Sequence, residues 1–281
     1  MQESAVVAER SADQPPGLHG AIASITILGG HGKSGEPEAI RRVQLEMGDV
    51  ISIVGPTGSG KTTLINDLEL FADGTTPTGR RILIDEATPP AAYRDDPAHH
   101  PIALITQHTT FLSDLPVREF ITTHAHIRQN EAWRVEQTLA ATLAFANELT
   151  GEPIPPQARM TELSGGQARA LMIADATIVC ETPIVLLDEV ENAGIHRTRA
   201  LELLRAHRKI FIFVTHDPRI ALLSKYRIVM ANGSMTHLLE TDESEREVSL
   251  RVNRLDDQLA RLREALRSGQ RLTSSAVEGW L

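Results

Sequence analysis

Residues 49–63 read DVISIVGPTGSGKTT. The apolar run at 50–54 is typical of a buried strand, and the glycine-rich stretch after it fits the pattern G-x-x-x-x-G-K-[ST] at every fixed position. A strand before the loop and a helix after it are the context in which this pattern binds phosphate, because the loop N–H groups and the helix N-terminus surround the anion. The stretch therefore predicts an α/β fold with a nucleotide phosphate site.

Each residue type in this stretch has a chemical task. The ammonium of Lys61 neutralises the β- and γ-phosphates, and the hydroxyl of Thr62 is a ligand for Mg²⁺. The expected phosphate-binding residues are Gly55, Pro56, Thr57, Gly58, Ser59, Gly60, Lys61, Thr62 and Thr63. A purely structural glycine turn is the alternative, and the strand and helix around it argue against that reading. The motif alone does not separate a kinase, a GTPase, a helicase and a cassette ATPase.

A second strand delivers a pair of carboxylates. The apolar run at 184–187 ends directly in Asp188 and Glu189. Two adjacent acids serve two tasks, since Asp188 is suited to hold Mg²⁺ through its water shell and Glu189 to polarise the water that attacks the γ-phosphate. An acidic helix N-cap is the alternative reading. The phosphate-binding loop in the same chain favours the catalytic one.

Residues 163–167 read LSGGQ, and an alanine-rich helical pattern follows at 168–176. Ser164, Gly165 and Gly166 therefore precede a helix N-terminus, where they form a second expected anion site. With this motif the sequence resembles the ATP-binding cassette (ABC) ATPases, whose signature is LSGGQ. The resemblance covers roughly residues 21–239 and includes, in order, the P-loop, Gln107 at a strand end, LSGGQ, the pair Asp188-Glu189 and then His216.

The resemblance implies a homodimer, or a pair of cassettes, that is arranged head to tail and buries two ATP sites between its subunits. In this arrangement one chain supplies the P-loop and the other supplies its signature. The signature residues that would close over the γ-phosphate of the partner's site are Ser164, Gly165, Gly166 and Gln167.

The resemblance also implies catalytic roles. It makes Gln107 a residue whose amide reaches Mg²⁺ and the attacking water, and it makes His216 one that contacts the γ-phosphate and steadies Glu189. Taken alone, a glutamine at a strand end has no particular meaning, and a histidine there is more often structural. The implied catalytic residues are Glu189, His216 and Gln107, the implied metal ligands are Thr62, Gln107 and Asp188, and the cofactors are ATP and Mg²⁺.

Strands that alternate with helices predict a largely parallel sheet. With the resemblance, the expected fold class is an α/β P-loop NTPase of ABC type, with a mixed sheet flanked by helices, an antiparallel β subdomain, an inserted helical subdomain and a C-terminal amphipathic helix. The expected divisions are a flexible leader at 1–20, the first part of the ATP-binding core with the β subdomain at 21–110, the helical subdomain at 111–163, the second part of the core at 164–240 and a coiled-coil-like helix at 243–268.

The C-terminal helix carries a seam of apolar residues. They are spaced 4, 3, 4, 3 and 4 residues apart within a charged segment: Val248, Val252, Leu255, Leu259, Leu262 and Leu266. This spacing is typical of a coiled coil, so we expect contact with a second chain. Packing of the stripe on the chain's own domain is the alternative, because the run is shorter than three heptads.

The sequence departs from the family pattern in three places. Residues 190–196 read VENAGIH, where transporter cassettes commonly have Pro-Thr and a Ser-Ala-Leu-Asp loop that links the two ATP sites. Arg169 stands one place early, and Asp175 stands where an arginine is common. Upstream of the P-loop, residues 29–35 offer no aromatic to stack on adenine, and His31 is either its substitute or a solvated turn residue. The hydrolytic residues are intact, which favours an active but specialised cassette.

Composition restricts the remaining possibilities. The 281 residues are 41% hydrophobic and 23% charged, as in ordinary globular proteins, and the formal net charge of −9 makes nucleic acid an unfavourable partner. A single cysteine, Cys180, excludes a disulfide within the chain. No apolar run reaches about 18 residues, and the first 20 residues lack the basic and apolar regions of a signal peptide. We expect a cytoplasmic protein, or one held at the inner face of the membrane by a partner.

Two functions remain open. The first is the cytoplasmic nucleotide-binding subunit of an ABC transporter, with a membrane permease as partner. It is favoured by the frequency of such subunits and by the ordinary length between Gln107 and LSGGQ. The second is a soluble ABC ATPase that activates or remodels an enzyme, or assembles a metal cofactor on a client protein. The unusual loop after Glu189 and the heptad-bearing tail favour it. A DNA-repair cassette and a regulator without turnover fit less well.

Overall fold

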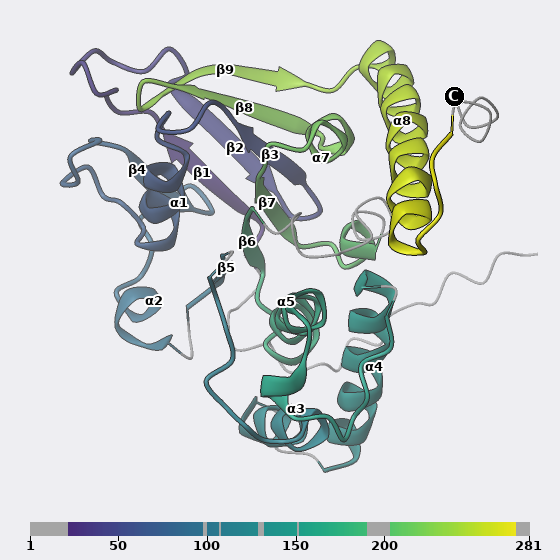
Figure 1. Cartoon of the computed structure of the whole chain (residues 1–281). Coiled ribbons are helices and arrows are strands. Elements are labelled where there is room, and N and C mark those ends of the chain that lie inside the picture. The colour runs from purple at the N-terminus through teal and green to yellow at the C-terminus, as the bar shows by residue number, and fades with distance from the viewer. Residues whose placement is uncertain are drawn as a thin grey trace, which may run out of the picture.

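The computed structural model describes residues 22–97, 100–106, 108–128, 132–150, 152–189 and 203–273. In these ranges the strands form a small antiparallel sheet and a larger mixed sheet, and helices gather below the larger one in the view of Figure 1. The small sheet has the order β2-β1-β4, with β1 at Ser24–Leu28, β2 at Arg42–Glu46 and β4 at Arg81–Ile84. Its strands pair antiparallel, as the β subdomain predicted from the sequence requires.

The larger sheet has the order β5-β6-β7-β3-β8-β9 in the described chain. Its strands are β3 at Val50–Val54, β5 at Ile102–Ile105, β6 at Ile184–Asp188, β7 at Ile210–Val214, β8 at Tyr226–Ala231 and β9 at Ser234–Glu240. All neighbours pair parallel except β8 and β9, which form an antiparallel hairpin. The carboxyl ends of β3, β6 and β7 therefore meet at one edge of the sheet, where ligands bind in open α/β folds.

Both faces of this sheet are covered, which explains why its strands read as continuous apolar runs. Successive residues of a strand point to opposite faces. Thus Val185 and Leu187 of β6 belong to the core cluster shared with the helical part, whereas Ile184 and Leu186 belong to the cluster shared with α1 and the small sheet. The sheet is the middle layer of three.

The helices are α1 at Lys61–Glu69, α2 at Ala92–Asp95, α3 at Val117–Arg128, α4 at Ala132–Thr150, α5 at Gly165–Ala174, α7 at Pro218–Leu223 and α8 at Glu243–Arg267. A 3-10 turn, η2, spans Met160–Glu162, and a π-helical turn, η3, spans Asp175–Val179. Helices α3, α4 and α5 pack on one another away from the small sheet (Figure 1). None of the described helices is both long and apolar enough to cross a bilayer.

Helix α8 stands apart at one side of the molecule and packs against α7 (Figure 1). Asp242 caps it by accepting a hydrogen bond from the N–H of Glu245 at 2.9 Å, and Arg227 of β8 pairs with Glu245 at 2.5 Å. Four residues of the predicted seam are exposed: Val248, Leu255, Leu259 and Leu266. Contact of this seam with a second chain stays a prediction.

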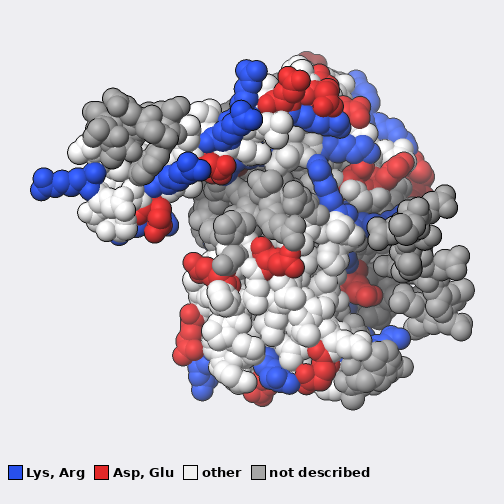
Figure 2. All heavy atoms as spheres, turned by 90° about the vertical axis from the view of Figure 1, so that its right-hand side faces the viewer, with Lys and Arg blue, Asp and Glu red and all other residues white. Residues whose placement is uncertain are grey.

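The face that carries α8 has charges of both signs. Figure 2 shows Lys and Arg side chains interspersed with Asp and Glu side chains over its upper part. Among the described residues of this face, neither sign forms a continuous field. Extended positive surfaces are what nucleic acid phosphates require, so this face gives such a partner no support.

Candidate phosphate and catalytic site

The predicted P-loop connects β3 to α1 at the carboxyl edge of the sheet. Its backbone passes so close to neighbouring backbone that side chains are excluded at two glycines. A Cβ on Gly55 would lie 2.3 Å from the carbonyl oxygen of Met230, and one on Gly60 would lie 2.8 Å from the Cα of Gly233. Both glycines also have positive φ, 153° and 100°. The loop conformation therefore requires the glycines that the motif specifies.

Lys61 is the first residue of α1 and is buried beneath the loop. Its ammonium donates hydrogen bonds to the carbonyl oxygens of Gly55 at 2.9 Å and Pro56 at 3.2 Å. The side chains of Thr62 and Thr63 are exposed beside it. A helix N-terminus, an ammonium group and a hydroxyl at one place form a donor set that fits a polyphosphate with Mg²⁺.

The turn between β8 and β9 supports the P-loop from behind. Asn232 and Gly233 have φ of 51° and 80°, as a tight hairpin turn requires. The N–H of Gly233 donates to the carbonyl oxygen of Ser59 at 2.7 Å. Lys33 joins both segments, because its N–H donates to the carbonyl of Asn232 and its ammonium to that of Gly58, each at 2.8 Å. An Asn-Gly pair is a local signal for such a turn, but no local signal indicates its contact with the P-loop.

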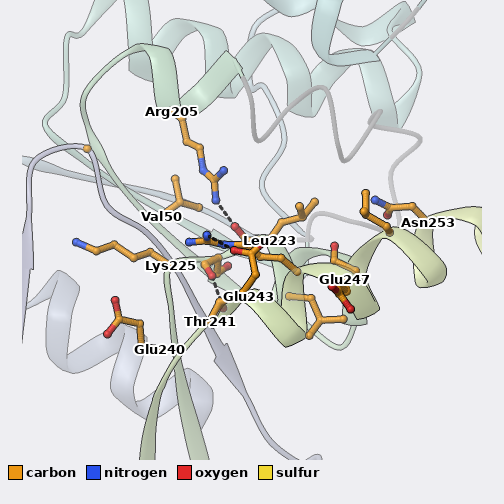
Figure 3. Close-up of a pocket in the computed structure, with 15 residues that line it drawn as sticks. Val50, Arg205, Leu223, Lys225, Glu240, Thr241, Glu243, Glu247 and Asn253 are labelled. Atoms are coloured by element: carbon orange, nitrogen blue, oxygen red, sulfur yellow. Dashed lines mark hydrogen bonds and ion pairs between the residues drawn. The ribbon is translucent and has the colours of Figure 1, made fainter.

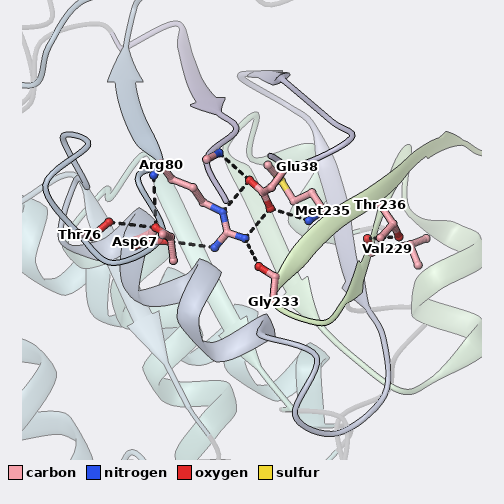
Figure 4. A network of polar contacts seen from close by, with 10 residues as sticks. Glu38, Asp67, Thr76, Arg80, Val229, Gly233, Met235 and Thr236 are labelled. Atoms are coloured by element: carbon pink, nitrogen blue, oxygen red, sulfur yellow. Dashed lines mark hydrogen bonds and ion pairs between the residues drawn. The ribbon is translucent and has the colours of Figure 1, made fainter. Parts of the chain in front are cut away.

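A buried ion network holds this turn in place (Figure 4). Arg80 is fully buried, and its guanidinium binds Glu38 through Nη2 at 2.6 Å and Nε at 3.1 Å, and Asp67 of α1 through Nη1 at 2.9 Å. Burial disfavours the charged form of Arg80, but the hydrogen bonds and charges of both carboxylates outweigh it and raise the pKa of the arginine.

The same network also binds backbone groups of Gly233, Gly30 and Met235. Arg80 donates to the carbonyl oxygen of Gly233 at 2.8 Å, so it contacts the turn that supports the P-loop. Glu38 accepts from the N–H groups of Gly30 at 2.8 Å and Met235 at 2.6 Å. Burial opposes ionisation of Glu38, yet the hydrogen bond from Arg80 and those from the two N–H groups lower its pKa. The network therefore fixes three separate chain segments with one cation.

The predicted carboxylates stand at the end of β6. Asp188 is the last residue of the strand, and Glu189 follows it with a left-handed backbone, φ 51°. The N–H of Glu189 donates to the carbonyl oxygen of Val214 at 3.0 Å, which holds the end of β6 against the end of β7. A left-handed backbone is uncommon outside glycine and is concentrated at functional sites.

The structure brings Glu189 and His216 together. Nε2 of His216 lies 3.5 Å from Oε1 of Glu189, and the two side chains are 49% and 36% exposed. The loop that carries His216 is anchored at Thr215, which is fully buried and whose N–H donates to the carbonyl oxygen of Ile53 at 3.2 Å. The histidine and the carboxylate therefore face each other where solvent has access, as activation of a water requires.

A pocket of about 480 Å³ joins this loop to the phosphate loop. It is lined by Val54, Gly55, Pro56, Thr215, His216, Asp217, Pro218, Ala221, Leu222 and Arg227. The start of the P-loop and His216 therefore line the same pocket. They are 161 positions apart in sequence, from Gly55 to His216, and only the parallel pairing of β3 with β7 makes them neighbours.

The residue after the histidine is clamped to the C-terminal helix. Asp217 caps α7 by accepting from the N–H of Arg219 at 2.9 Å, and its carboxylate also binds the guanidinium of Arg219 at 2.8 Å. The same guanidinium pairs with Asp256 of α8. Arg219 is mostly buried between the two carboxylates. One arginine thus connects α8 to the loop that carries His216.

A larger pocket, of about 680 Å³, lies where α7 and α8 meet the start of β3 (Figure 3). Arg205 and Lys225 line it together with Glu240, Glu243 and Glu247. Because β3 begins here and ends at the P-loop, this pocket lies at the opposite edge of the sheet. It contains none of the residues predicted for the phosphate site.

The predicted signature forms the N-terminus of α5. Ser164 is the N-cap, and its Oγ accepts from the N–H of Gln167 at 3.2 Å while the Gln167 amide oxygen accepts from the N–H of Ser164 at 3.0 Å. The amide nitrogen of Gln167 donates to the carbonyl of Pro153 at 3.0 Å. Ser164 and Gly165 are exposed. Helices α1 and α5 lie well apart in Figure 1, so the chain does not bring its own signature to its own P-loop.

Some predicted features lie outside the described residues. Gln107 is one of them, and the unusual loop at 190–196 is another. Their predicted roles stay predictions. His31 is described and exposed, and its ring lies beside Gly79, where Nδ1 would be 3.0 Å from an added Cβ. Its proposed contact with adenine is likewise untested by this geometry.

No sequence motif points to the residues that support the site. Glu38, Asp67 and Arg80 stand in segments without any motif, and their contact depends on the path of the chain between them. Lys33 lies in a glycine-rich stretch that fits no phosphate-binding pattern. Charged residues outside a motif are mostly solvated, so none of the four stood out.

Comparison with known proteins identifies relatives of this chain. The family model described as "ABC transporter" matches residues 41–192. An uncharacterised ABC transporter ATP-binding protein of Methanocaldococcus jannaschii is 47% identical over 256 residues, which are 91% of this chain and 97% of that protein. The macrolide export ATP-binding/permease protein MacB of Campylobacter jejuni is 29% identical over 232 residues, which are 78% of this chain and 34% of MacB.

Solved structures share the fold. The dimeric, post-hydrolysis state of an ATP-binding cassette bound to ADP and Pi superposes with a TM-score of 0.58 at 22% identity, covering 78% of this chain and 99% of that one. CbiO1 from Clostridium perfringens, part of an ABC transporter complex, gives 0.60 at 21% identity and covers 85% of this chain and all of its own. At such identities the likeness shows the fold alone, and it confirms the predicted fold class.

Proposed function

The chain belongs to the family of ABC transporter ATP-binding proteins, which are ATPases, and on this basis we propose that it hydrolyses Mg-ATP between two copies of itself to drive a membrane permease. It acts as the nucleotide-binding subunit, on the cytoplasmic side of the membrane. The relatives named as transporter ATP-binding proteins support this role.

The observation that carries the proposal is the pairing of Glu189 with His216 at 3.5 Å beside the P-loop. A carboxylate that accepts a proton from water, and a second group that orients it, are the minimum for attack on a phosphoryl group. Thr62 and Asp188 would hold Mg²⁺, with Gln107 as a further ligand, and the metal supplies charge neutralisation of the phosphates. Lys61 binds the phosphates from below the loop.

The exposure of two complementary surfaces supports the dimer. The P-loop presents Pro56, Thr57 and Gly58 to solvent, and the N-terminus of α5 presents Ser164 and Gly165. Because these surfaces are apart within one chain, an anion held by the first is closed off only by the second surface of another copy. The solved relative that is dimeric with ADP and Pi supports this arrangement.

Replacing Gly165 with Asp is expected to lower the ATPase rate about 100-fold or more. A carboxylate at this place repels the γ-phosphate of the partner's site, where loss of one anion-stabilising donor already costs about 100- to 1,000-fold. The substitution should leave the fold intact, because an added Cβ meets only Nη1 of Arg169 at 3.7 Å. An acidic side chain in the first turn of a helix is also stabilising. Steady-state kinetics measures the ATPase rate, and sedimentation with Mg-ATP measures dimerisation.

The matched control is Gly165→Ala, which adds the Cβ without the charge and should keep most of the activity. Thermal unfolding of Gly165→Asp should resemble that of the wild type. An Asp variant that hydrolyses ATP and dimerises at wild-type levels would exclude the signature from the ATP site.

The permease is tested by affinity purification. We expect the tagged chain, incubated with detergent-solubilised membranes of its own organism and Mg-ATP, to retain a protein with several membrane spans, identified by mass spectrometry. Lys61→Ala is the control, because it weakens nucleotide binding without touching exposed surfaces. Retention of a soluble enzyme, with no membrane protein enriched, would instead favour a cassette that activates a client.

A further inference from the structure

We propose that His124, Asp175 and Cys180 form a binding site for a divalent metal of the zinc class, separate from the ATP site. His124 lies on α3, Asp175 is the first residue of the π-helical turn η3, and Cys180 follows its last residue. In the described part of the chain, this is the one group of three His, Cys, Asp or Glu side chains whose donor atoms are close enough to hold a metal ion.

The three side chains lie within reach of one ion, because one donor atom from each lies within 4.8 Å of the others. Asp175 and Cys180 lie at different nitrogens of the His124 ring: Oδ1 of Asp175 is 2.8 Å from Nδ1, whereas Sγ of Cys180 is 3.8 Å from Nε2 and 3.8 Å from Oδ2 of Asp175. Zinc ligands at about 2.0–2.3 Å from the ion are about 3.3–3.8 Å from one another in a tetrahedron. Since one ring binds an ion through a single nitrogen, metal binding would require these side chains to rotate until one nitrogen of His124 faces both partners.

The backbone is shaped to bring two of the donors together. In an α-helix, residues five apart point about 140° away from each other. Here the α-helix ends at Ala174 and the chain widens, so that the N–H of Cys180 donates to the carbonyl oxygen of Asp175 at 2.9 Å. This i to i+5 turn sets both side chains on the side that faces His124. Such π-helical turns are rare and are frequent at functional sites.

The surroundings suit a partly desolvated metal with one open position. The side chains of His124 and Asp175 are 25% and 14% exposed, and Cys180 is half-buried. The ring of Phe120 meets that of His124 edge-on, with centroids 6.0 Å apart. Aromatic cover on one side and solvent on the other leave room for three protein ligands and one water, which is a common zinc arrangement.

The donor set selects the class of metal. A thiolate, an imidazole and a carboxylate suit Zn²⁺ or Co²⁺, whereas Mg²⁺ and Ca²⁺ prefer oxygen ligands alone. To bind the ion, Cys180 would lose its thiol proton and His124 would be neutral, so metal binding at this site should release protons.

Metal at this site would connect helix α3 to the end of helix α5. Helix α5 begins at the signature and leads directly into η3, while α3 belongs to the helical part. A bound ion therefore ties α3 to the far end of the signature helix. This link does not depend on the proposed transport role, because none of the three ligands belongs to the phosphate site.

The test is Co²⁺ titration of the full chain, freed of metal by chelation and kept reduced, without nucleotide. We expect one Co²⁺ per chain, near-ultraviolet thiolate-to-cobalt absorption, visible bands of four-coordinate cobalt, and displacement of both signals by Zn²⁺. Cys180→Ser should lose the thiolate band, and His124→Ala should bind Co²⁺ about 100-fold more weakly. The matched control is His126→Ala, an exposed histidine of the same helix, which should bind as the wild type does.

Lys61→Ala should also bind Co²⁺ normally, which separates this site from the ATP site. Absence of the thiolate band in the wild type, or its survival in Cys180→Ser, would overturn the proposal. So would equal Co²⁺ affinities for His124→Ala and His126→Ala. In that case the three residues are a hydrogen-bonded cluster that only packs α3 on η3.

Discussion

Glu189→Gln is expected to lower ATP hydrolysis by about 100-fold or more while ATP binding persists. General-base catalysis contributes about 100- to 10,000-fold, and an amide does not accept the proton of the attacking water. The change keeps the size of the side chain and its position beside His216. Because the ATP cannot be turned over, it should remain between two subunits, so the variant should elute as a dimer with Mg-ATP in gel filtration.

The control is a Glu→Gln change at a site far from the catalytic residues. Glu46→Gln alters an exposed residue of β2 and should leave both the rate and the elution volume unchanged. Rapid turnover by Glu189→Gln would remove Glu189 from the base role. Slow turnover without a trapped dimer would instead support Glu189 as the base but contradict the proposal that ATP holds two subunits together.

Arg80→Met is expected to lower the free energy of unfolding by about 3–5 kcal/mol, because it leaves two carboxylates buried without their cation. Glu38 and Asp67 are almost fully buried, so water cannot replace the lost guanidinium unless the structure opens. ATP affinity should fall as well, since Arg80 holds Gly233 and Gly233 supports the P-loop. Urea denaturation followed by circular dichroism gives the first quantity and nucleotide titration the second.

An exposed ion pair of the same kind is the control. Arg42 and Glu86 pair at 2.5 Å with about half of each side chain in solvent. Arg42→Met should therefore cost less than about 1 kcal/mol and leave ATP affinity unchanged. If both methionine variants unfold at the same urea concentration, the buried network does not stabilise the protein in the manner described.

The fold and the family could be predicted because their signals are local. The pattern at 55–62 needs a strand before it and a helix after it, and parallel strands place their carboxyl ends together whatever the loops between them do. Glu189 and His216 are brought together for this reason. The role of each predicted site residue in hydrolysis remains a prediction, which the variants above examine.

The supporting contacts could not be predicted, because they join residues that share no pattern. Arg80 meets carboxylates 42 and 13 positions away, and an arginine before a strand is normally solvated. The helical pattern at 168–176 likewise gave no sign that the α-helix ends at Ala174. The β-branched Thr177, Ile178 and Val179 disfavour a regular helix there, which is a weak local signal for the wider turn.

Arg219 joins the C-terminal helix to the loop that carries His216 through two ion pairs. A single positive charge serves two carboxylates, one on α8 and one adjoining His216. A displacement of α8 would remove one of the two carboxylates that hold Arg219, and the loop that carries His216 would lose its link to the C-terminal helix.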